Sequence, residues 1–253
     1  MKLSIIIPTL NQEQDLHQCL NVMMRQSYDF YEVIVVDGGT KNFDINGLKN
    51  KFKNVKFISE SDNGVYDAMN KGVTLASGEW LYFMGVDDSF YDVGVLESVD
   101  FYFRKKDIKL ILGQIVYDLG GKDSYFVRKN KGLIRPKWSN EMWIKNTLHH
   151  QGAFYHKSNF EKEYYDMSYK ILADYAFNLN LWKRRIPVVI LDKKIASCGS
   201  KGMSKKYNYT LYKEDIILKT KASSILLTPL FVLFSVIKFC LNKSTRVSVP
   251  PRK

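Results

Sequence analysis

Ser4-Ile5-Ile6-Ile7-Pro8-Thr9 is an apolar, β-branched run that ends in loop-forming residues, a pattern typical of a buried strand. A second such run, Glu32–Asp37, follows a segment of helical composition at about Gln12–Gln26. Two strands joined by a helical crossover are expected to lie parallel, because the crossover returns the chain to the same end of the sheet. The start of the chain therefore predicts a parallel sheet.

The same alternation continues along the chain. We expect a strand at Val55–Ser59, a helix at Tyr66–Ala76 and a strand at Trp80–Met84. Further strands are predicted at Leu110–Val116, Gly152–His156 and Val188–Leu191, and a helix at about Asp174–Arg185. This order predicts an α/β fold with a doubly wound, mainly parallel sheet flanked by helices, whose ligands bind beyond the carboxyl ends of the strands.

The composition is that of a globular protein with its own core: 253 residues, 45% hydrophobic and 25% charged. Cys19, Cys198 and Cys240 are far apart and lack metal-ligand spacing, which argues against a disulfide framework or a zinc site. The N-terminal apolar run is too short for a signal peptide. We therefore expect a protein that stays in the cytosol.

The charge of the chain is unevenly distributed. The net charge of +12 comprises −7 over residues 1–100, +10 over 101–200 and +9 over 201–253. Carboxylates gathered in the acidic part would repel a phosphate ligand unless a divalent cation lay between them. The basic remainder suits an anionic surface. A nucleic-acid-binding protein is the rival interpretation of so basic a chain, and the acidic first hundred residues argue against it.

Acidic residues stand at the ends of several predicted elements. Asp37 precedes two glycines, where it could contact a nucleotide or simply terminate the strand as a turn residue. Asp62 precedes a helix, and it could contact a nucleotide or simply cap that helix. Asp87 and Asp88 follow the strand Trp80–Met84, where two carboxylates could bind Mn²⁺ or Mg²⁺.

Asp174 lies at the start of a predicted helix. The helix dipole and the free amides there would keep its carboxylate ionised, so that it could accept a proton from a hydroxyl group. A helix N-cap is the plainer interpretation of the same residue. His149 and His150 have no third ligand nearby in the sequence, which argues against a zinc site.

Three motifs occur in the order of one known family: the strand ending in Pro8-Thr9, the run Asp62-Asn63-Gly64-Val65-Tyr66-Asp67-Ala68-Met69-Asn70-Lys71-Gly72, and the triplet Val86-Asp87-Asp88. They resemble glycosyltransferase family two, inverting enzymes with the GT-A fold, over about residues 1–204. The resemblance implies that Asp88 holds a divalent cation, Mn²⁺ or Mg²⁺. It assigns the nucleotide-sugar site to Pro8, Thr9, Asp37, Asp62, Lys71 and Asp87.

The resemblance also implies an acceptor side. Asp174 matches the general base of the family, although Ala173 stands where many relatives have a second acid. His150 and Gln151 match a His-Gln pair near the acceptor. The loop at residues 199–204 resembles a Gly-Gly-x-Ser motif with Lys201 in place of its first glycine, a lysine that could reach a phosphate or be an ordinary loop cation.

The segment Ala222–Ile237 has sixteen residues without a charge, contains Pro229 and is followed by Lys238 and a basic end. A helix that spans a membrane needs about 20 apolar residues, so this segment could just cross, lie at the interface or form a core helix. We expect residues 205–253 to form a helical tail that associates with an anionic membrane surface.

These observations predict an enzyme with a nucleotide-sugar-binding half at 1–100 and an acceptor-binding half at 101–204. The resemblance implies transfer of a hexose or N-acetylhexosamine from a UDP-linked donor to a polyisoprenyl-diphosphate-linked saccharide. Capsule, O-antigen or exopolysaccharide biosynthesis at the cytoplasmic face of the bacterial inner membrane is the implied setting. A non-catalytic membrane scaffold is the other alternative, which the presence of Asp88 and Asp174 argues against.

Overall fold

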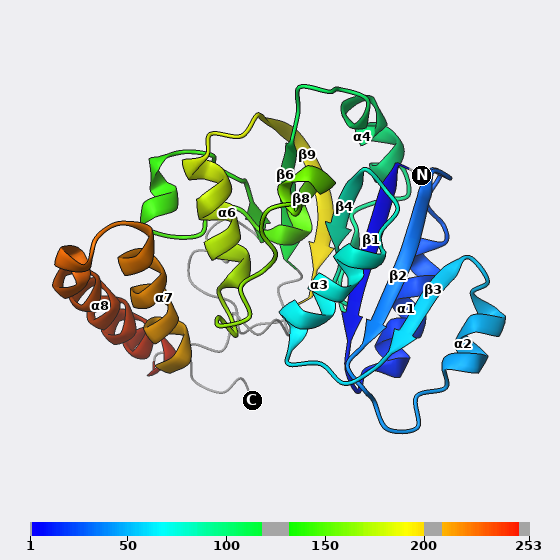
Figure 1. The fold of residues 1–253 in the computed structure, drawn as a ribbon, viewed down its shortest axis with the longest axis horizontal. Helices are drawn as coiled ribbons and strands as arrows, with labels where there is room; N and C mark the ends of the chain where they lie inside the picture. Colours follow the sequence, from blue (N-terminus) through cyan, green and yellow to red (C-terminus); the bar gives the residue numbers. More distant parts are fainter. Residues whose placement is uncertain (1, 118–131, 200–208, 248–253) are drawn as a thin grey trace.

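The computed structural model describes residues 2–117, 132–199 and 209–247, with side chains up to residue 240 (Figure 1). In these residues a nine-stranded sheet has the order β3-β2-β1-β4-β8-β6-β9-β5, with β7 paired to β6. The strands are β1 (Leu3–Thr9), β2 (Tyr31–Asp37), β3 (Val55–Ser59), β4 (Trp80–Phe83), β5 (Ser89–Phe90), β6 (Leu110–Tyr117), β7 (Leu133–Ile134), β8 (Ala153–His156) and β9 (Val188–Cys198).

The α-helices are α1 (Glu13–Met23), α2 (Ile45–Lys51), α3 (Val65–Leu75), α4 (Val95–Phe103), α6 (Ala173–Lys183), α7 (Tyr209–Ala222) and α8 (Thr228–Val247). Short 3₁₀ helices are η1 (Asn140–Trp143), η2 (His150–Gly152), η3 (Lys157–Asn159) and η5 (Ile225–Leu227).

The first half of the sheet is parallel throughout, because β1 pairs with β2 and β4, and β2 pairs with β3. The second half is mixed: β8 runs antiparallel to β4 and β6, whereas β9 runs parallel to β6. The predicted α/β fold with a mainly parallel sheet is confirmed. β9 extends to Cys198, well beyond the predicted Val188–Leu191. The prediction ended too early because the charged residues at 192–194, which are exposed in the strand, interrupt the apolar pattern.

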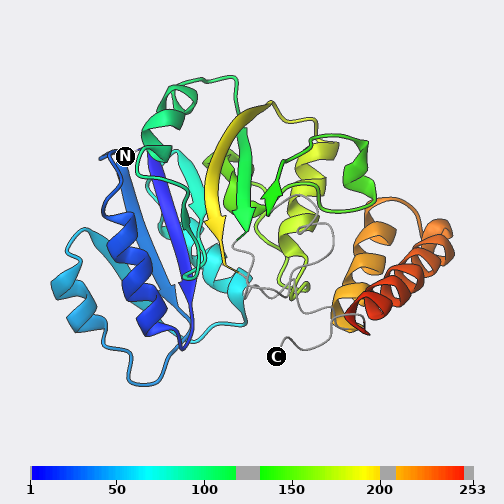
Figure 2. The same cartoon turned by 180° about the vertical axis from the view of Figure 1, so that it is seen from behind.

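Helices cover both faces of the sheet, with α1 and α4 on one face and α3 and α6 on the other (Figures 1 and 2). Alternate residues of the central strands supply the two cores. Ile5 and Ile7 of β1 belong to the cluster that contains Leu20 of α1, whereas Ile6 belongs to the cluster that contains Val73 of α3. The run that is apolar on both faces of the strand is therefore explained by burial on both sides.

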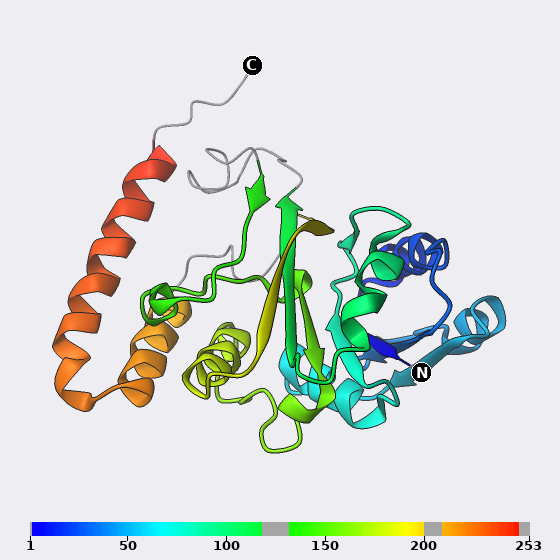
Figure 3. The same ribbon diagram turned by 90° about the horizontal axis from the view of Figure 1, so that it is seen from above.

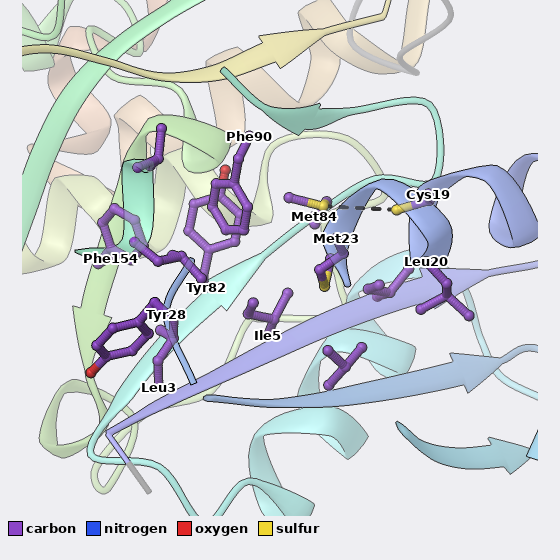
Figure 4. Close-up of a cluster of buried hydrophobic side chains, with 14 of the residues drawn as sticks. Leu3, Ile5, Cys19, Leu20, Met23, Tyr28, Tyr82, Met84, Phe90 and Phe154 are labelled. Atoms are coloured by element: carbon purple, nitrogen blue, oxygen red, sulfur yellow. Dashed lines mark hydrogen bonds between the residues drawn. The ribbon is translucent and has the colours of Figure 1, made fainter. Parts of the chain in front are cut away.

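Cys19 of α1 lies within the first of these cores, with its Sγ 3.8 Å from Sδ of Met84 (Figure 4). Burial, followed by the charges of Asp88 and Asp87, raises the pKa of this thiol to about 12. Cys19 therefore stays protonated and packs as a small apolar residue.

The apolar stretch noted at Ala222–Ile237 runs from the last residue of α7 through η5 into the first half of α8. α7 ends at Ala222, and α8 begins at Thr228 with Pro229 in its first turn, where a proline costs no intrahelical hydrogen bond. Pro229 therefore starts a helix instead of interrupting one. Figure 3 shows α8 along the edge of the molecule, beside α7.

Among the described residues, no helix is long and apolar enough to cross a membrane. The apolar side chains of α8 are not a core either, because Leu233, Phe234 and Val236 are about half exposed. α7 differs from α8, since its Leu218 is buried in the core cluster of α3 and α6. A helix of the predicted tail at 205–253 thus packs into the predicted domain at 1–204, and the boundary between the two stays a prediction.

A buried carboxylate ties together the amino-terminal edge of the sheet. Glu32 Oε1 accepts hydrogen bonds from Ser4 Oγ at 2.6 Å, Ser77 N at 2.7 Å and Gly78 N at 3.3 Å, and Oε2 pairs with Lys56 Nζ at 2.7 Å. Burial would raise the pKa of Glu32, but the hydrogen bonds from Lys56, Ser4 and Ser77 lower it to about 2. The ionised form of Glu32 therefore stabilises the fold.

We expect Glu32→Gln to lower the free energy of unfolding at about pH 7 by about 1–3 kcal/mol, because the amide loses the ion pair and accepts fewer hydrogen bonds. The pKa of Glu32 is about 2 in the fold against an ordinary 4.5. The contribution of the charge is therefore complete above 4.5 and is lost as the pH falls toward 2. Urea unfolding of both proteins should show a smaller difference at about pH 3 than at about pH 7. Equal differences at the two pH values would contradict the role of the charge.

Candidate active site

The first acidic residue of the site lies at the carboxyl end of β2. The Asp37 carboxylate is fully buried and accepts hydrogen bonds from Gly39 N at 3.1 Å, Thr40 N at 2.9 Å and Ser59 Oγ at 2.7 Å. It thereby holds the loop after β2 against the end of β3. This geometry matches the turn-residue interpretation of Asp37, and its contact with a nucleotide stays a prediction.

Asp62 lies against the same loop. Its Oδ1 accepts a hydrogen bond from Gly64 N at 2.9 Å, and its Oδ2 lies 2.4 Å from the position that a Cβ on Gly38 would occupy. A side chain at position 38 would therefore push the carboxylate away. Gly64 turns the chain into α3 with a φ of 121°, which a glycine adopts without strain.

Lys71 of α3 reaches the same edge of the sheet. Its Nζ donates to the Ser61 carbonyl oxygen at 2.8 Å, and it lies 2.9 Å from Glu60 Oε1 and 3.8 Å from Asp67 Oδ2. The side chain is one-quarter exposed. The ammonium group therefore belongs to a local ion-pair network in which acidic residues predominate.

Pro8 and Thr9 end β1 beside these residues, with Pro8 opposite Val36 and Thr9 opposite Asp37. The Thr9 hydroxyl is buried, and no hydrogen-bond partner for it exists among the residues that the structure describes. An unpartnered hydroxyl in such a place is suited to a ligand. The structure thus brings the predicted nucleotide residues of β1, β2 and the start of α3 to one edge of the sheet.

Asp88 is buried in the turn after β4. Its Oδ2 accepts hydrogen bonds from Gln151 Nε2 at 2.6 Å and Gly85 N at 3.2 Å, and its Oδ1 accepts one from Gly199 N at 3.0 Å. Burial and the charge of Asp87 raise the pKa of Asp88 despite these bonds. Gln151, predicted on the acceptor side, therefore forms a hydrogen bond with the predicted metal ligand.

The oxygens of Asp87 and Asp88 are of the donor type that Mn²⁺ and Mg²⁺ prefer. A cation beside them would offset the repulsion that raises the pKa of Asp88. In the described ranges, no three His, Cys, Asp or Glu side chains gather into a metal cluster. The donor set fits a cation that takes its other ligands from substrate or water.

Asp174 lies in the first turn of α6, with 14% of its side chain exposed. Its Oδ2 is 3.4 Å from His150 Nδ1 and 3.5 Å from Asn146 Nδ2, and its Oδ1 accepts a hydrogen bond from Tyr66 OH at 3.1 Å. Burial would raise the pKa of Asp174, but the hydrogen bond from His150 and the charges of His150 and His149 lower it. The neighbouring histidine, more than the helix start on which the prediction rested, keeps this carboxylate ionised.

Two residues of the site were not predicted. Tyr66 stands inside the motif at residues 62–72, and its place in that motif was a usable signal. Asn146 lies in a loop after η1 without any distinguishing pattern, so the sequence offered no signal for it. Lys201, predicted to reach a phosphate, lies outside the described residues.

The family model of glycosyl transferase family 2 matches residues 4–163, and the chain belongs to this family. The chain is 33% identical over 187 residues to a PGL/p-HBAD biosynthesis glycosyltransferase of Mycobacterium tuberculosis. This match covers 70% of the chain and 68% of that protein. A Methanococcus voltae relative is 26% identical over 261 residues, covering 93% of this chain and 81% of its own. Its name is dolichyl N-acetyl-alpha-D-glucosaminyl phosphate 3-beta-D-2,3-diacetamido-2,3-dideoxy-beta-D-glucuronosyltransferase.

Solved structures share the fold at low sequence identity. S. aureus TarS in complex with UDP-GlcNAc has a TM-score of 0.69 and 17% identity, covering 92% of this chain and 70% of that one. A mannosyltransferase from Pyrobaculum calidifontis in complex with GDP-Man and Mn²⁺ has a TM-score of 0.60 and 14% identity, covering 99% and 76%. The predicted GT-A fold is confirmed.

We expect His150→Gln to raise the pKa of Asp174, because a neutral amide at position 150 lacks the positive charge that favours the ionised carboxylate. Carbon-13 NMR titration of labelled aspartate carboxyl groups measures this pKa directly. His17→Gln is the matched control, since His17 lies on α1 near Lys51 and should leave Asp174 unchanged. A pKa of Asp174 that is equal in all three proteins would show that His150 is not its cause.

Proposed function

We propose that this protein transfers a hexose or N-acetylhexosamine from a UDP sugar to a hydroxyl group of a lipid-linked oligosaccharide, with inversion at the anomeric carbon. The observation that carries the proposal is that two consecutive residues connect two carboxylates, those of Asp174 and Asp88. His150 lies beside Asp174, and Gln151 donates to Asp88. Membership of glycosyl transferase family 2 supports the reaction class.

Asp174 is the proposed general base. Its lowered pKa keeps it ionised at neutral pH, and Tyr66 and His150 orient its two oxygens. The acceptor oxygen forms a bond to the anomeric carbon as the bond from that carbon to the diphosphate oxygen breaks, and the hydroxyl proton passes to Asp174. Attack opposite the leaving group inverts the carbon. A positioned base of this kind contributes about 10²- to 10⁴-fold to the rate.

The donor side is the edge of the sheet formed by Thr9, Asp37, Asp62, Lys71 and Asp87. The nucleotide sugars in the complexes of TarS and the Pyrobaculum enzyme support this role for a GT-A fold. Mn²⁺ or Mg²⁺, held by Asp88, would offset the negative charge that develops on the departing nucleoside diphosphate. The Mn²⁺ in the Pyrobaculum complex supports the choice of ion.

The acceptor is proposed to be carried by a membrane lipid, as a polyisoprenyl-diphosphate-linked saccharide in capsule, O-antigen or exopolysaccharide assembly. The name of the Methanococcus relative, which includes a dolichyl-linked phosphate, supports such an acceptor. Ile225 and Leu226 of η5 are 77% and 85% exposed, and residues 201–253 carry a net charge of +9. These features suit a segment that lies on the anionic cytoplasmic face of a bacterial inner membrane.

We expect Asp174→Asn to bind the donor as the wild type does but to lose turnover by about 10²- to 10⁴-fold, because the amide keeps the shape of the carboxylate and cannot take a proton. Release of nucleoside diphosphate from a panel of nucleotide sugars, with and without Mn²⁺, measures turnover, and calorimetry measures donor affinity. Parallel losses of affinity and turnover would make Asp174 a structural residue. Absence of release from every donor in the wild type would overturn the proposed function.

We expect Leu226→Glu to weaken binding to vesicles that contain anionic lipid by at least about tenfold, because an exposed apolar side chain contributes about 1.5–3 kcal/mol when buried. Flotation with such vesicles measures the binding. Phe101→Glu is the matched control, since Phe101 is also exposed, at 60%, but lies on α4 at the other side of the molecule (Figure 1). Equal binding by Leu226→Glu and wild type would contradict the membrane contact.

A further inference from the structure

A buried carboxylate of α7 holds the chain segment that leads into Asp174. Glu214 is only 6% exposed. Its Oε1 accepts a hydrogen bond from Lys170 N at 2.7 Å, and its Oε2 accepts bonds from Ile171 N and Leu172 N, each at 3.0 Å. Three consecutive backbone amides thus point at one side chain from a different helix.

The start of α6 needs this partner. The N-cap residue of α6 is Leu172, whose side chain cannot accept a hydrogen bond. The first amides of a helix lack partners within the helix and carry a partial positive charge, which favours a carboxylate. Of the three amides that Glu214 holds, that of Leu172 belongs to the N-cap residue, and those of Lys170 and Ile171 precede the helix. Glu214 therefore anchors the chain that leads into α6 and fixes the backbone two residues before Asp174.

The held segment also contacts the base through Tyr66. Tyr66 OH lies 2.7 Å from the carbonyl oxygen of Ile171 and 3.1 Å from Asp174 Oδ1, so one hydroxyl serves both. A shift of the backbone at 171 would redirect this hydroxyl. The orientation of the Asp174 carboxylate therefore depends on where Glu214 holds the segment.

α7 supports the opposite side of the base as well. Lys219 is 4% exposed, pairs with Asp215 Oδ2 at 2.7 Å and donates to the carbonyl oxygen of Ile144 at 2.8 Å. Asn146, two residues later, is the side chain that lies near Asp174 Oδ2. Both loops that frame Asp174 are thus held by polar side chains of α7.

We propose that Glu214 is a positioning residue of the active site: it acts through the backbone at 170–172 to aim Asp174 at the acceptor hydroxyl. The proposal rests on the proposed role of Asp174 as the base. A displacement of about 1 Å in a catalytic group can cost about a hundredfold in rate, so an anchor at this place affects turnover and not only stability. The first helix of the predicted tail, α7, then supports the active site.

The test compares Glu214→Gln with Glu32→Gln in the full chain. Both remove a buried carboxylate that accepts backbone amides, but Glu32 lies at the opposite edge of the sheet. We expect Glu214→Gln to lower kcat by about ten- to a hundredfold with the KM for the donor unchanged. We expect Glu32→Gln to keep the kcat of the wild type even if its melting temperature falls as far as that of Glu214→Gln.

Hydrogen exchange gives a readout that does not depend on activity. The amides of Lys170, Ile171 and Leu172 should exchange faster in Glu214→Gln and unchanged in Glu32→Gln. If Glu214→Gln does not fold, Glu214→Asp carries the test, because it keeps the charge and shortens the reach to the amides.

If the wild type is active and the folded Glu214 variant has the same kcat, the positioning role is overturned and the proposed function is not. A fall in kcat that matches the fall in Glu32→Gln makes Glu214 a stabilising residue only. A wild type without transferase activity overturns the proposed function instead, and the exchange of the three amides still decides whether Glu214 holds this segment.

Discussion

The proposed site depends on two consecutive residues of η2. His150 lies beside Asp174, and Gln151 donates to Asp88, so a single turn of backbone connects the two carboxylates. That turn is itself held firmly. Tyr82 OH of β4 donates to the carbonyl oxygen of Gln151 at 2.6 Å, and a Cβ on Gly152 would lie 2.7 Å from the Gly113 carbonyl oxygen. The separation of the proposed base, Asp174, from the proposed metal ligand, Asp88, is therefore set by the packing of η2 against β4 and β6.

Buried carboxylates are a recurring feature of this fold, and most are stabilised by hydrogen bonds. Asp37, Glu32 and Glu214 each accept bonds from backbone amides, which compensate for lost hydration. Asp88 also accepts three hydrogen bonds, yet burial and the charge of Asp87 raise its pKa. A cation beside Asp88 would offset this repulsion, in agreement with its proposed role.

The C-terminal residues serve two different purposes. α7 places Leu218 in the core and Glu214 on the segment before Asp174, whereas η5 and α8 present apolar side chains to the solvent. Lys238 of α8 lies 3.3 Å from Asp215 of α7, so the exposed helix is fastened to the buried one. In the proposed function, the surface of η5 and α8 that contacts the membrane thus lies next to α7, which supports Asp174.

The strand–helix order can be read from the amino-acid sequence alone, since β-branched runs and helical segments are local patterns. That order predicts parallel strands whose carboxyl ends meet, and the acids that follow them, Asp37 and Asp88, were predicted there for this reason. The side chains that meet the carboxylates could be identified from the three-dimensional fold but not from the sequence. Gln151 joins Asp88 across 63 residues and Glu214 joins Leu172 across 42, and such partners are chosen by the packing of whole elements, which leaves no trace in local residue patterns. The place of α7 in the core, through Leu218, is likewise a matter of long-range packing.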